Sequence, residues 1–175
     1  MTLHILKVGG KVIDDLALLR PILESFLQKE GKKIIVHGGG KKASELSEKL
    51  GIAVQMVNGR RITDAASLEV ATMVYAGLFN KQIVALLQSL GGNALGLSGA
   101  DGNVILAHRR PVKEIDYGFV GDFDAINAPA IQRLLSAEFT PVFCAITHDG
   151  QGQLLNTNAD AIASSLATAM SGLYE

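Results

Sequence analysis

This sequence lacks the disulfides and zinc-ligand spacings that stabilise many small proteins, and it lacks the long apolar runs that span membranes. Its single cysteine, Cys144, excludes an internal disulfide, and no Cys or His spacing matches a structural zinc site. It has no tryptophan, only 5% aromatic residues, and no uninterrupted run of 18 apolar residues. The 16 Lys and Arg residues nearly balance the 17 Asp and Glu residues, which argues against a general nucleic-acid-binding surface. We therefore expect a cytoplasmic protein with no nucleic-acid or membrane partner.

What the sequence does have is enough apolar material for one core, punctuated by many glycines. Its 175 residues match the usual size of one domain, and 48% of them are hydrophobic. Several of the 19 glycines directly follow short Val, Ile and Leu runs, a pattern typical of strand-to-helix turns. We expect residues 1–175 to form a single α/β domain.

Strands and helices alternate through the first fifty residues. The pattern predicts a strand at 3–8, a helix at 16–27 capped by Asp14 or Asp15, a strand at 33–37 and a helix at 41–50. This order implies parallel pairing with right-handed crossovers. The glycine turns that follow the two strands should therefore lie at the same edge of the sheet and face one crevice.

The rest of the chain continues in the same style. It predicts strands at 53–57, 94–97, 104–108 and 140–146, a β-hairpin at 109–124, and helices at 64–90, 129–135 and from 158 onward. Thr63 or Asp64 can cap the first of these helices, and Thr157 or Asn158 can cap the last. The helix at 64–90 has apolar residues around most of its circumference, so it must be covered on several sides. We therefore predict a homodimer packed partly through this helix, and a helix enclosed within the monomer is the alternative.

Two glycine turns are the first candidates for a functional site. Lys7-Val8-Gly9-Gly10 places a lysine beside one turn, and His37-Gly38-Gly39-Gly40-Lys41 opens a helix. Free amides in such turns, a helix N-terminus and an ammonium all favour a phosphate or a carboxylate. Neither turn matches a P-loop or a dinucleotide fingerprint, and a solvated lysine and a plain tight turn are the ordinary alternatives.

Polar residues in two further segments could hold a ligand. Arg61 precedes a capped helix and can grip a carboxylate with two hydrogen bonds, although a surface arginine is the alternative. Asn156, Asn158 and Asp160 alternate near the start of the last helix, where capping accounts for only one of the three. The histidines have no metal-ligand spacing and no G-x-S-x-G occurs, so metalloenzyme and hydrolase chemistry lack support.

Four motifs in order make the whole chain resemble the amino acid kinase family, in particular its members that act on N-acetyl-L-glutamate. They are K-V-G-G at Lys7, H-G-G-G-K at His37, N-G-R-R-I-T at Asn58 and L-N-T-N-A-D at Leu155. The resemblance implies a three-layer αβα sandwich with a mainly parallel central sheet. It also implies transfer of the γ-phosphoryl of ATP to the side-chain carboxylate of N-acetyl-L-glutamate, or a related N-acylglutamate, in arginine biosynthesis.

The resemblance also implies a role for each matched residue. Lys7 and Asp160 would be catalytic: Lys7 would stabilise charge on the transferring phosphoryl, and Asp160 would orient the lysine. The phosphate would be bound by Gly9, Gly10 and Gly38. The substrate would be bound by Gly39, Gly40, Arg61, Asn156 and Asn158. No general base is needed, since a γ-carboxylate with a solution pKa near 4.3 is already ionised at neutral pH.

The co-substrate and the extent of the chain follow from the same resemblance. ATP with Mg²⁺ would be the co-substrate, with no tightly bound cofactor and no metal site in this chain. Family members continue into a nucleotide-binding lobe, so we expect this chain to be the amino-acid-binding lobe, weakly active or inactive alone. A kinase acting on aspartate, glutamate, carbamate or uridylate, and a non-catalytic amino-acid-binding module, remain alternative interpretations.

The hairpin at 109–124 is the expected wall of the acyl pocket. Acetyl and succinyl groups differ at the far end of that pocket. Arg109, Arg110 or Lys113 could favour a second carboxylate there, which would select a succinyl group.

Overall fold

A parallel four-stranded sheet forms the centre of the computed structural model, which describes residues 1–57 and 60–174. Its strand order is β1-β2-β8-β5, formed by Leu3–Val8, Lys32–His37, Thr140–Cys144 and Ala94–Leu97. All three pairings are parallel. The side chains of β8 are buried throughout, as in a strand covered on both faces.

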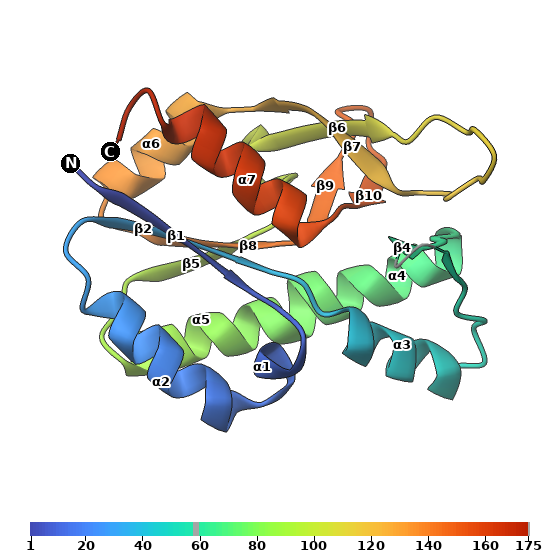
Figure 1. Cartoon of the computed structure of the whole chain (residues 1–175), viewed down its shortest axis with the longest axis horizontal. Coiled ribbons are helices and arrows are strands. Elements are labelled where there is room, and N and C mark those ends of the chain that lie inside the picture. The colour runs from blue at the N-terminus through green and yellow to red at the C-terminus, as the bar shows by residue number, and fades with distance from the viewer. Residues whose placement is uncertain (58–59, 175) are drawn as a thin grey trace.

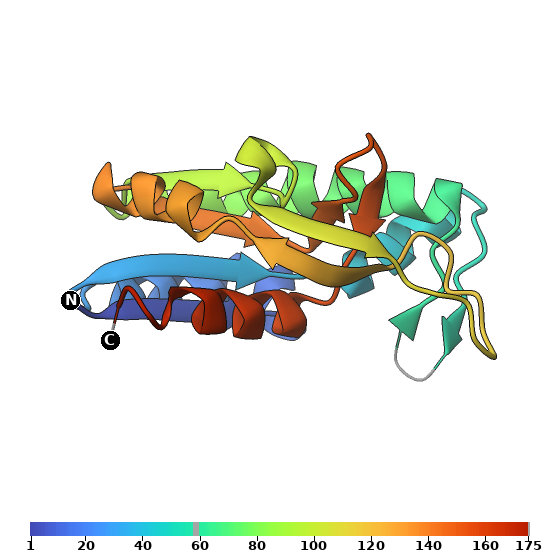
Figure 2. The ribbon, with the colours of Figure 1, turned by 90° about the horizontal axis from the view of Figure 1, so that it is seen from above.

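Helices cover both faces of this sheet (Figures 1 and 2). On one side lie α1 (Lys11–Asp14), α2 (Leu16–Leu27), α3 (Gly40–Lys49) and the long helix that includes α5 (Asn80–Ser89); on the other lie α6 (Ala128–Ser136) and α7 (Ala159–Met170). Each helix turns an apolar stripe inward, as Leu19, Leu23 and Phe26 do in α2. The predicted three-layer αβα sandwich is confirmed.

Side-chain caps explain where several helices begin. Asp15 accepts hydrogen bonds from two amides at the start of α2, and Asp64 accepts one from Ser67 N at the start of α4 (Ala65–Thr72). Asn158 does the same for α7. All three caps were among the predicted candidates.

The predicted helix at 64–90 is observed as one continuous helix of 25 residues, Ala65–Ser89. Its middle, η1 (Met73–Phe79), is π-helical, a local widening that the apolar pattern did not indicate. By length and composition alone the helix could cross a membrane. In this fold it is a core helix, because Val70, Ile83 and Leu87 are buried against the domain.

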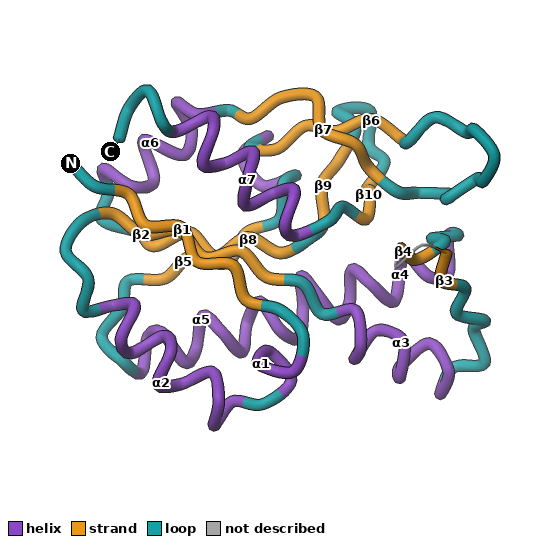
Figure 3. The backbone as a smooth tube through the Cα atoms, in the orientation of Figure 1, coloured by secondary structure: helices purple, strands orange, loops and turns teal. Residues whose placement is uncertain are grey.

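A second, mixed sheet stands beside the central one, and it corrects the predicted strand at 140–146. Its order is β10-β9-β6-β7, formed by Leu154–Asn156, Ile146–His148, Ile105–Arg109 and Gly121–Ile126. The predicted strand is therefore two strands, β8 and β9, which belong to different sheets and are separated at Ala145. Figure 3 shows β9 and β10 at the carboxyl end of β8.

Two other predicted elements are shorter or displaced. The strand expected at 53–57 is only β3 (Met56–Val57), which pairs with β4 (Arg60–Arg61). The turn between them, Asn58-Gly59, lies outside the described residues. The hairpin exists, but its strands are β6 and β7, and residues 110–120 form the loop between them. Much of this loop has its backbone partners elsewhere, because Tyr117 and Phe119 bond to Thr63.

Candidate functional site

The two glycine turns lie side by side, as the predicted parallel pairing requires. β1 and β2 run in register to their ends, where Val8 pairs with His37. Gly38 N donates to Val8 O at 3.4 Å, so the turns are joined through their backbones. Gly38 thus differs from the expectation of a bare amide, because its N–H is engaged within the fold. Within the described residues, Gly9, Gly10 and Gly39 have backbone N–H groups with no such partner.

Lys7 folds back over the first turn. Its Nζ lies 2.9 Å from Asp160 Oδ1, an ion pair that links the end of β1 to the start of α7. A Cβ on Gly9 would lie only 2.7 Å from Lys7 Nζ. Gly9 is therefore required less for its backbone angles than for the space that the ammonium occupies. The predicted partnership of Lys7 and Asp160 agrees with this contact.

The second turn is held by aromatic rings below it. Gly39 has φ 156°, and a Cβ there would lie 2.7 Å from the Phe79 ring and 2.9 Å from the Tyr75 ring. Since real Cβ atoms do not approach ring carbons so closely, only glycine fits. Both rings come from the π-helical segment η1, so this segment determines how far the turn can move.

His37 anchors the same turn from inside the sheet. It is fully buried, its Nδ1 donates to Gly38 O at 2.9 Å, and its Nε2 accepts from Asn80 Nδ2 at 3.1 Å. Burial lowers the pKa of His37 to about 4, and Lys81 lowers it further while the Gly38 bond opposes the shift. The ring is therefore neutral at physiological pH and acts as a fixed support.

Cys144 lies beside His37 across the strands, yet the pair is unsuited to thiol chemistry. The two residues are register partners in β2 and β8. Burial raises the pKa of the Cys144 thiol to about 12, while His37 is held neutral. A thiolate nucleophile requires the opposite shift, so Cys144 has the environment of a core residue.

A cavity of about 440 Å³ opens next to the second turn. Its lining residues are Gly40, Lys41, Ser44, Met56, Arg61, Tyr75, Arg110, Val120, Asn156, Thr157 and Asn158. Four of the five predicted substrate-binding residues therefore meet in one place, and the fifth, Gly39, lies against Tyr75, which lines the cavity. Lys7, Gly9 and Gly10 lie outside this lining at the first turn, and Gly38 of the second turn and Asp160 at the start of α7 are outside it as well.

Arg61 is the dominant charge of the cavity. Only 7% of the residue is exposed, and its Nη2 donates to Gly40 O at 2.9 Å and to Ser44 Oγ at 2.6 Å. Across the described part of the chain it has no acidic partner. A buried guanidinium without a counter-ion is costly, and an anionic ligand in the cavity would supply the missing charge.

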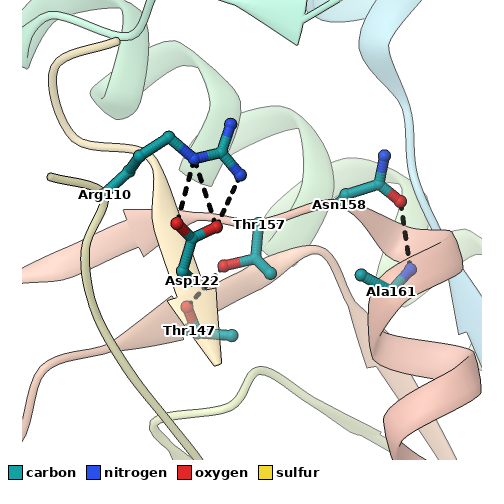
Figure 4. Close-up of polar contacts among 6 residues, drawn as sticks. All are labelled: Arg110, Asp122, Thr147, Thr157, Asn158 and Ala161. Atoms are coloured by element: carbon teal, nitrogen blue, oxygen red, sulfur yellow. Dashed lines mark hydrogen bonds and ion pairs between the residues drawn. The ribbon is translucent and has the colours of Figure 1, made fainter. Parts of the chain in front are cut away.

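The asparagines at the start of α7 present different groups. Asn158 Oδ1 accepts from Asp160 N at 2.8 Å and from Ala161 N at 3.1 Å, so its oxygen is used in capping and its amide nitrogen points away from the helix (Figure 4). Asn156 Nδ2 donates to the Thr63 hydroxyl. Between them, Thr157 is fixed by a 2.7 Å contact with Thr147, and both hydroxyls fill the space beside Gly121.

Arg110 forms the far wall of the cavity. Figure 4 shows its guanidinium against Asp122, with Nε 3.0 and 3.1 Å from the two carboxylate oxygens. The Asp122 hydrogen bonds, opposed in part by burial, raise the pKa of Arg110. Of the three basic residues predicted on the hairpin, only Arg110 lines this cavity, because Arg109 is turned toward Asp116 and Phe119 and Lys113 lines a separate hollow.

Sequence reasoning missed several residues of the cavity. Ser44, Tyr75 and Val120 belong to segments that carry no motif. Burial raises the pKa of Tyr75, and nearby Arg61 opposes that shift. The spacing of these residues reflects helix and strand packing, so a single sequence offered no signal for them.

The sequence of this chain is similar to those of known proteins. Residues 2–172 match the model of the amino acid kinase family. The acetylglutamate kinase of Bacteroides fragilis is 53% identical over 173 residues, which cover 99% of this chain and 66% of that protein. The acetylglutamate kinase of Methanopyrus kandleri is 39% identical over 172 residues, covering 96% of this chain and 67% of that protein. The chain thus spans about two thirds of the length of these relatives.

Solved structures agree on the fold. Smu.665 from Streptococcus mutans superposes with a TM-score of 0.80 at 25% identity, covering 97% of this chain and 69% of that one. N-acetylglutamate synthase from Neisseria gonorrhoeae, complexed with coenzyme A and N-acetyl-glutamate, superposes with a TM-score of 0.82 at 20% identity, covering 97% of this chain and 39% of that one.

Proposed function

Because this chain belongs to the amino acid kinase family, we propose that it binds N-acetyl-L-glutamate, or a related N-acylglutamate, for ATP-dependent phosphorylation of the side-chain carboxylate in arginine biosynthesis. The observation that carries the proposal is the buried Arg61 in the cavity, which has no acidic partner among the residues that the structure describes. N-acetyl-L-glutamate has two carboxylates, and one of them would form an ion pair with Arg61.

The arrangement of the site supports this chemistry. The γ-carboxylate is ionised at neutral pH, so it attacks the phosphorus of ATP directly while the bond to the leaving ADP oxygen breaks. The protein must bring two anions together and offset their repulsion. We propose that Lys7 and the free amides of Gly9, Gly10 and Gly39 serve that purpose beside the cavity, with Asp160 holding Lys7.

ATP with Mg²⁺ is the proposed co-substrate. Among the described residues, no group of three or more His, Cys, Asp and Glu side chains could hold a metal ion. The donor set thus fits Mg²⁺ carried by the ATP phosphates better than a dedicated protein site. We assign residues 1–175 to binding of the acyl amino acid, in the cytoplasm, as one lobe of the kinase.

Calorimetric titration with N-acetyl-L-glutamate, with and without a non-hydrolysable ATP analogue, tests the proposal. We expect binding by the wild-type chain and, for Arg61→Gln, an affinity lower by about 10- to 100-fold, the usual effect of losing a charge-assisted hydrogen bond. Arg133→Gln, on the exposed face of α6, is the matched control and should bind normally. No heat from the folded wild-type chain with either ligand would contradict the proposal.

A further inference from the structure

Thr63 is a buried hydroxyl placed between the two main polar residues of the cavity. It is 0% exposed and is not part of the cavity lining, whereas Arg61 and Asn156 are. Its hydroxyl contacts both of their segments: it lies 3.2 Å from Arg61 O and 3.1 Å from Asn156 Nδ2. Thr63 is the last residue of the N-G-R-R-I-T motif, but the sequence indicated no role for it except that of a helix-cap candidate, and that capping is done by Asp64.

The direction of these hydrogen bonds determines how the Asn156 amide is turned. A threonine hydroxyl has one proton, and here the proton goes to the Arg61 carbonyl. Only lone pairs then remain for Asn156, so the group facing Thr63 must be the Nδ2 donor. The opposite orientation would place Oδ1 against the hydroxyl, and one proton could not satisfy two acceptors.

The backbones of the two residues are held by the same piece of chain. Thr63 N donates to Tyr117 O at 2.9 Å, Phe119 N donates to Thr63 O at 2.7 Å, and Asn156 N donates to Phe119 O at 2.9 Å. Gly118 fits between them at φ 70°, where a Cβ would lie 2.2 Å from Thr63 O. The hydroxyl and the amide therefore cannot easily move apart.

From this arrangement, and resting on the proposed function, we infer that Thr63 is a positioning residue that makes Asn156 Oδ1 the acceptor for the substrate's amide N–H. An N-acylglutamate with both carboxylates ionised has a single hydrogen-bond donor, the N–H of its acyl amide. Among the described residues, the Asn156 side-chain oxygen accepts no hydrogen bond, so it can accept one from this N–H. The second N–H of Asn156 Nδ2 can donate to a carboxylate oxygen of the substrate. Asn156 would therefore bind the acyl amide and a carboxylate of the substrate at the same time.

The test compares two ligands that differ only at that donor: N-acetyl-L-glutamate and (S)-2-acetoxyglutarate, in which an ester oxygen replaces the N–H. Calorimetry of the wild-type chain should show the amide binding about tenfold more tightly, because the ester leaves the Asn156 oxygen unpaired. Thr63→Val should reduce this preference to within about twofold, and Thr63→Ser, which restores the hydroxyl, should keep it. Thr72→Val is the control, since the Thr72 hydroxyl has no hydrogen-bond partner among the described residues.

The outcomes separate a positioning role from a structural one. If Thr63 only supports the fold, Thr63→Val weakens both ligands equally and the preference survives, which overturns the inference. Equal binding of the two ligands by the wild-type chain overturns it without any variant. If the wild-type chain binds neither ligand, the proposed function fails as well. Circular dichroism establishes folding first, and Thr63→Cys, of similar size with a weak hydrogen-bonding group, replaces a Thr63→Val that does not fold.

Discussion

At the residue scale, the candidate site depends on two glycines that leave space for neighbouring side chains and on one arginine without an acidic partner among the described residues. Gly9 leaves room for the Lys7 ammonium, and Gly39 leaves room for the rings of Tyr75 and Phe79. Arg61 has hydrogen bonds but no acid among the described residues. Adding a single carbon at Gly9 or Gly39 would fill space that a neighbouring side chain occupies, and Arg61 needs a ligand to neutralise its charge. Small substitutions at these three positions should therefore change ligand binding.

Gly9→Ala should weaken anion binding at the turns with little effect on folding. Gly9 is not among the glycines with positive φ, and the atom that its Cβ would meet is the mobile end of Lys7. The ammonium should move aside, so pyrophosphate affinity, measured by calorimetry with N-acetyl-L-glutamate at saturation, should fall about tenfold. The free energy of unfolding should change by no more than about 0.5 kcal/mol.

Gly172→Ala is the control for that measurement, because a Cβ at Gly172 meets nothing within 4 Å. Equal pyrophosphate affinity in Gly9→Ala and Gly172→Ala would show that the Lys7 ammonium does not contribute to anion binding at this turn.

At the scale of elements, a buried polar network ties the second glycine turn to the helix layer. Asn80, 1% exposed at the start of α5, donates to His37 on β2 and, at 2.8 Å, to Val142 O on β8. Its Oδ1 accepts from Lys81 at 3.0 Å. The side-chain amide of Asn80 on α5 thus connects the strands β2 and β8. The network requires a neutral His37, because His37 Nε2 must accept the hydrogen bond from Asn80 Nδ2.

The free energy of unfolding should therefore decrease as the pH falls from about 6.5 to about 4. The unfolded chain binds a proton at His37 near pH 6.5, whereas the folded chain binds it only near pH 4, so acid favours unfolding in this window. The full effect is about 3 kcal/mol, since one pKa unit corresponds to about 1.4 kcal/mol. Urea denaturation at a series of pH values measures it.

His37→Gln should flatten that pH dependence, and His4→Gln should leave it in place. His4 is only partly buried and its ring bonds to Glu30 O at the surface. A His37→Gln profile with the wild-type slope would mean that other groups titrate in the window and that the network does not require a neutral ring.

At the scale of the whole molecule, the long helix Ala65–Ser89 leaves apolar side chains exposed to solvent. Met73 and Leu78, both on its π-helical segment, are 48% and 41% exposed although their neighbours are core residues. The monomer therefore covers only part of the helix, and exposed apolar side chains remain on its π-helical segment. We propose a homodimer packed partly through the helix at 64–90.

Light scattering coupled to size exclusion tests the dimer. The wild-type chain should elute with twice its mass of 18.5 kDa, and Met73→Glu or Leu78→Glu should shift it to the monomer, because a buried unpaired carboxylate is costly. Leu50→Glu, at the exposed end of α3, introduces the same charge elsewhere and should leave the mass unchanged. A wild-type monomer at high concentration would exclude this mode of assembly.

Local chemistry was readable from the sequence because the relevant forces are local. The runs at 3–8 and 33–37, the caps Asp15 and Asn158, and the glycine turns depend on a few consecutive residues, and parallel pairing follows from their order. Strand breaks were not readable in this way. Residues 140–146 look like one apolar strand, and only the competition between two sheets for partners divides them at Ala145.

By itself, the sequence determined that two glycine turns with Lys7 would share one sheet edge, and it pointed to Arg61, Asn156 and Asn158 as polar candidates. Only the tertiary structure decided that these three line one cavity, that Arg110 joins them already paired with Asp122, and that Thr63 turns the Asn156 amide. The physical reason is the distance along the chain over which the interactions act. Turns and caps are set by neighbours in the chain, whereas a buried charge or an oriented amide depends on groups tens of residues away that only packing brings within hydrogen-bond distance.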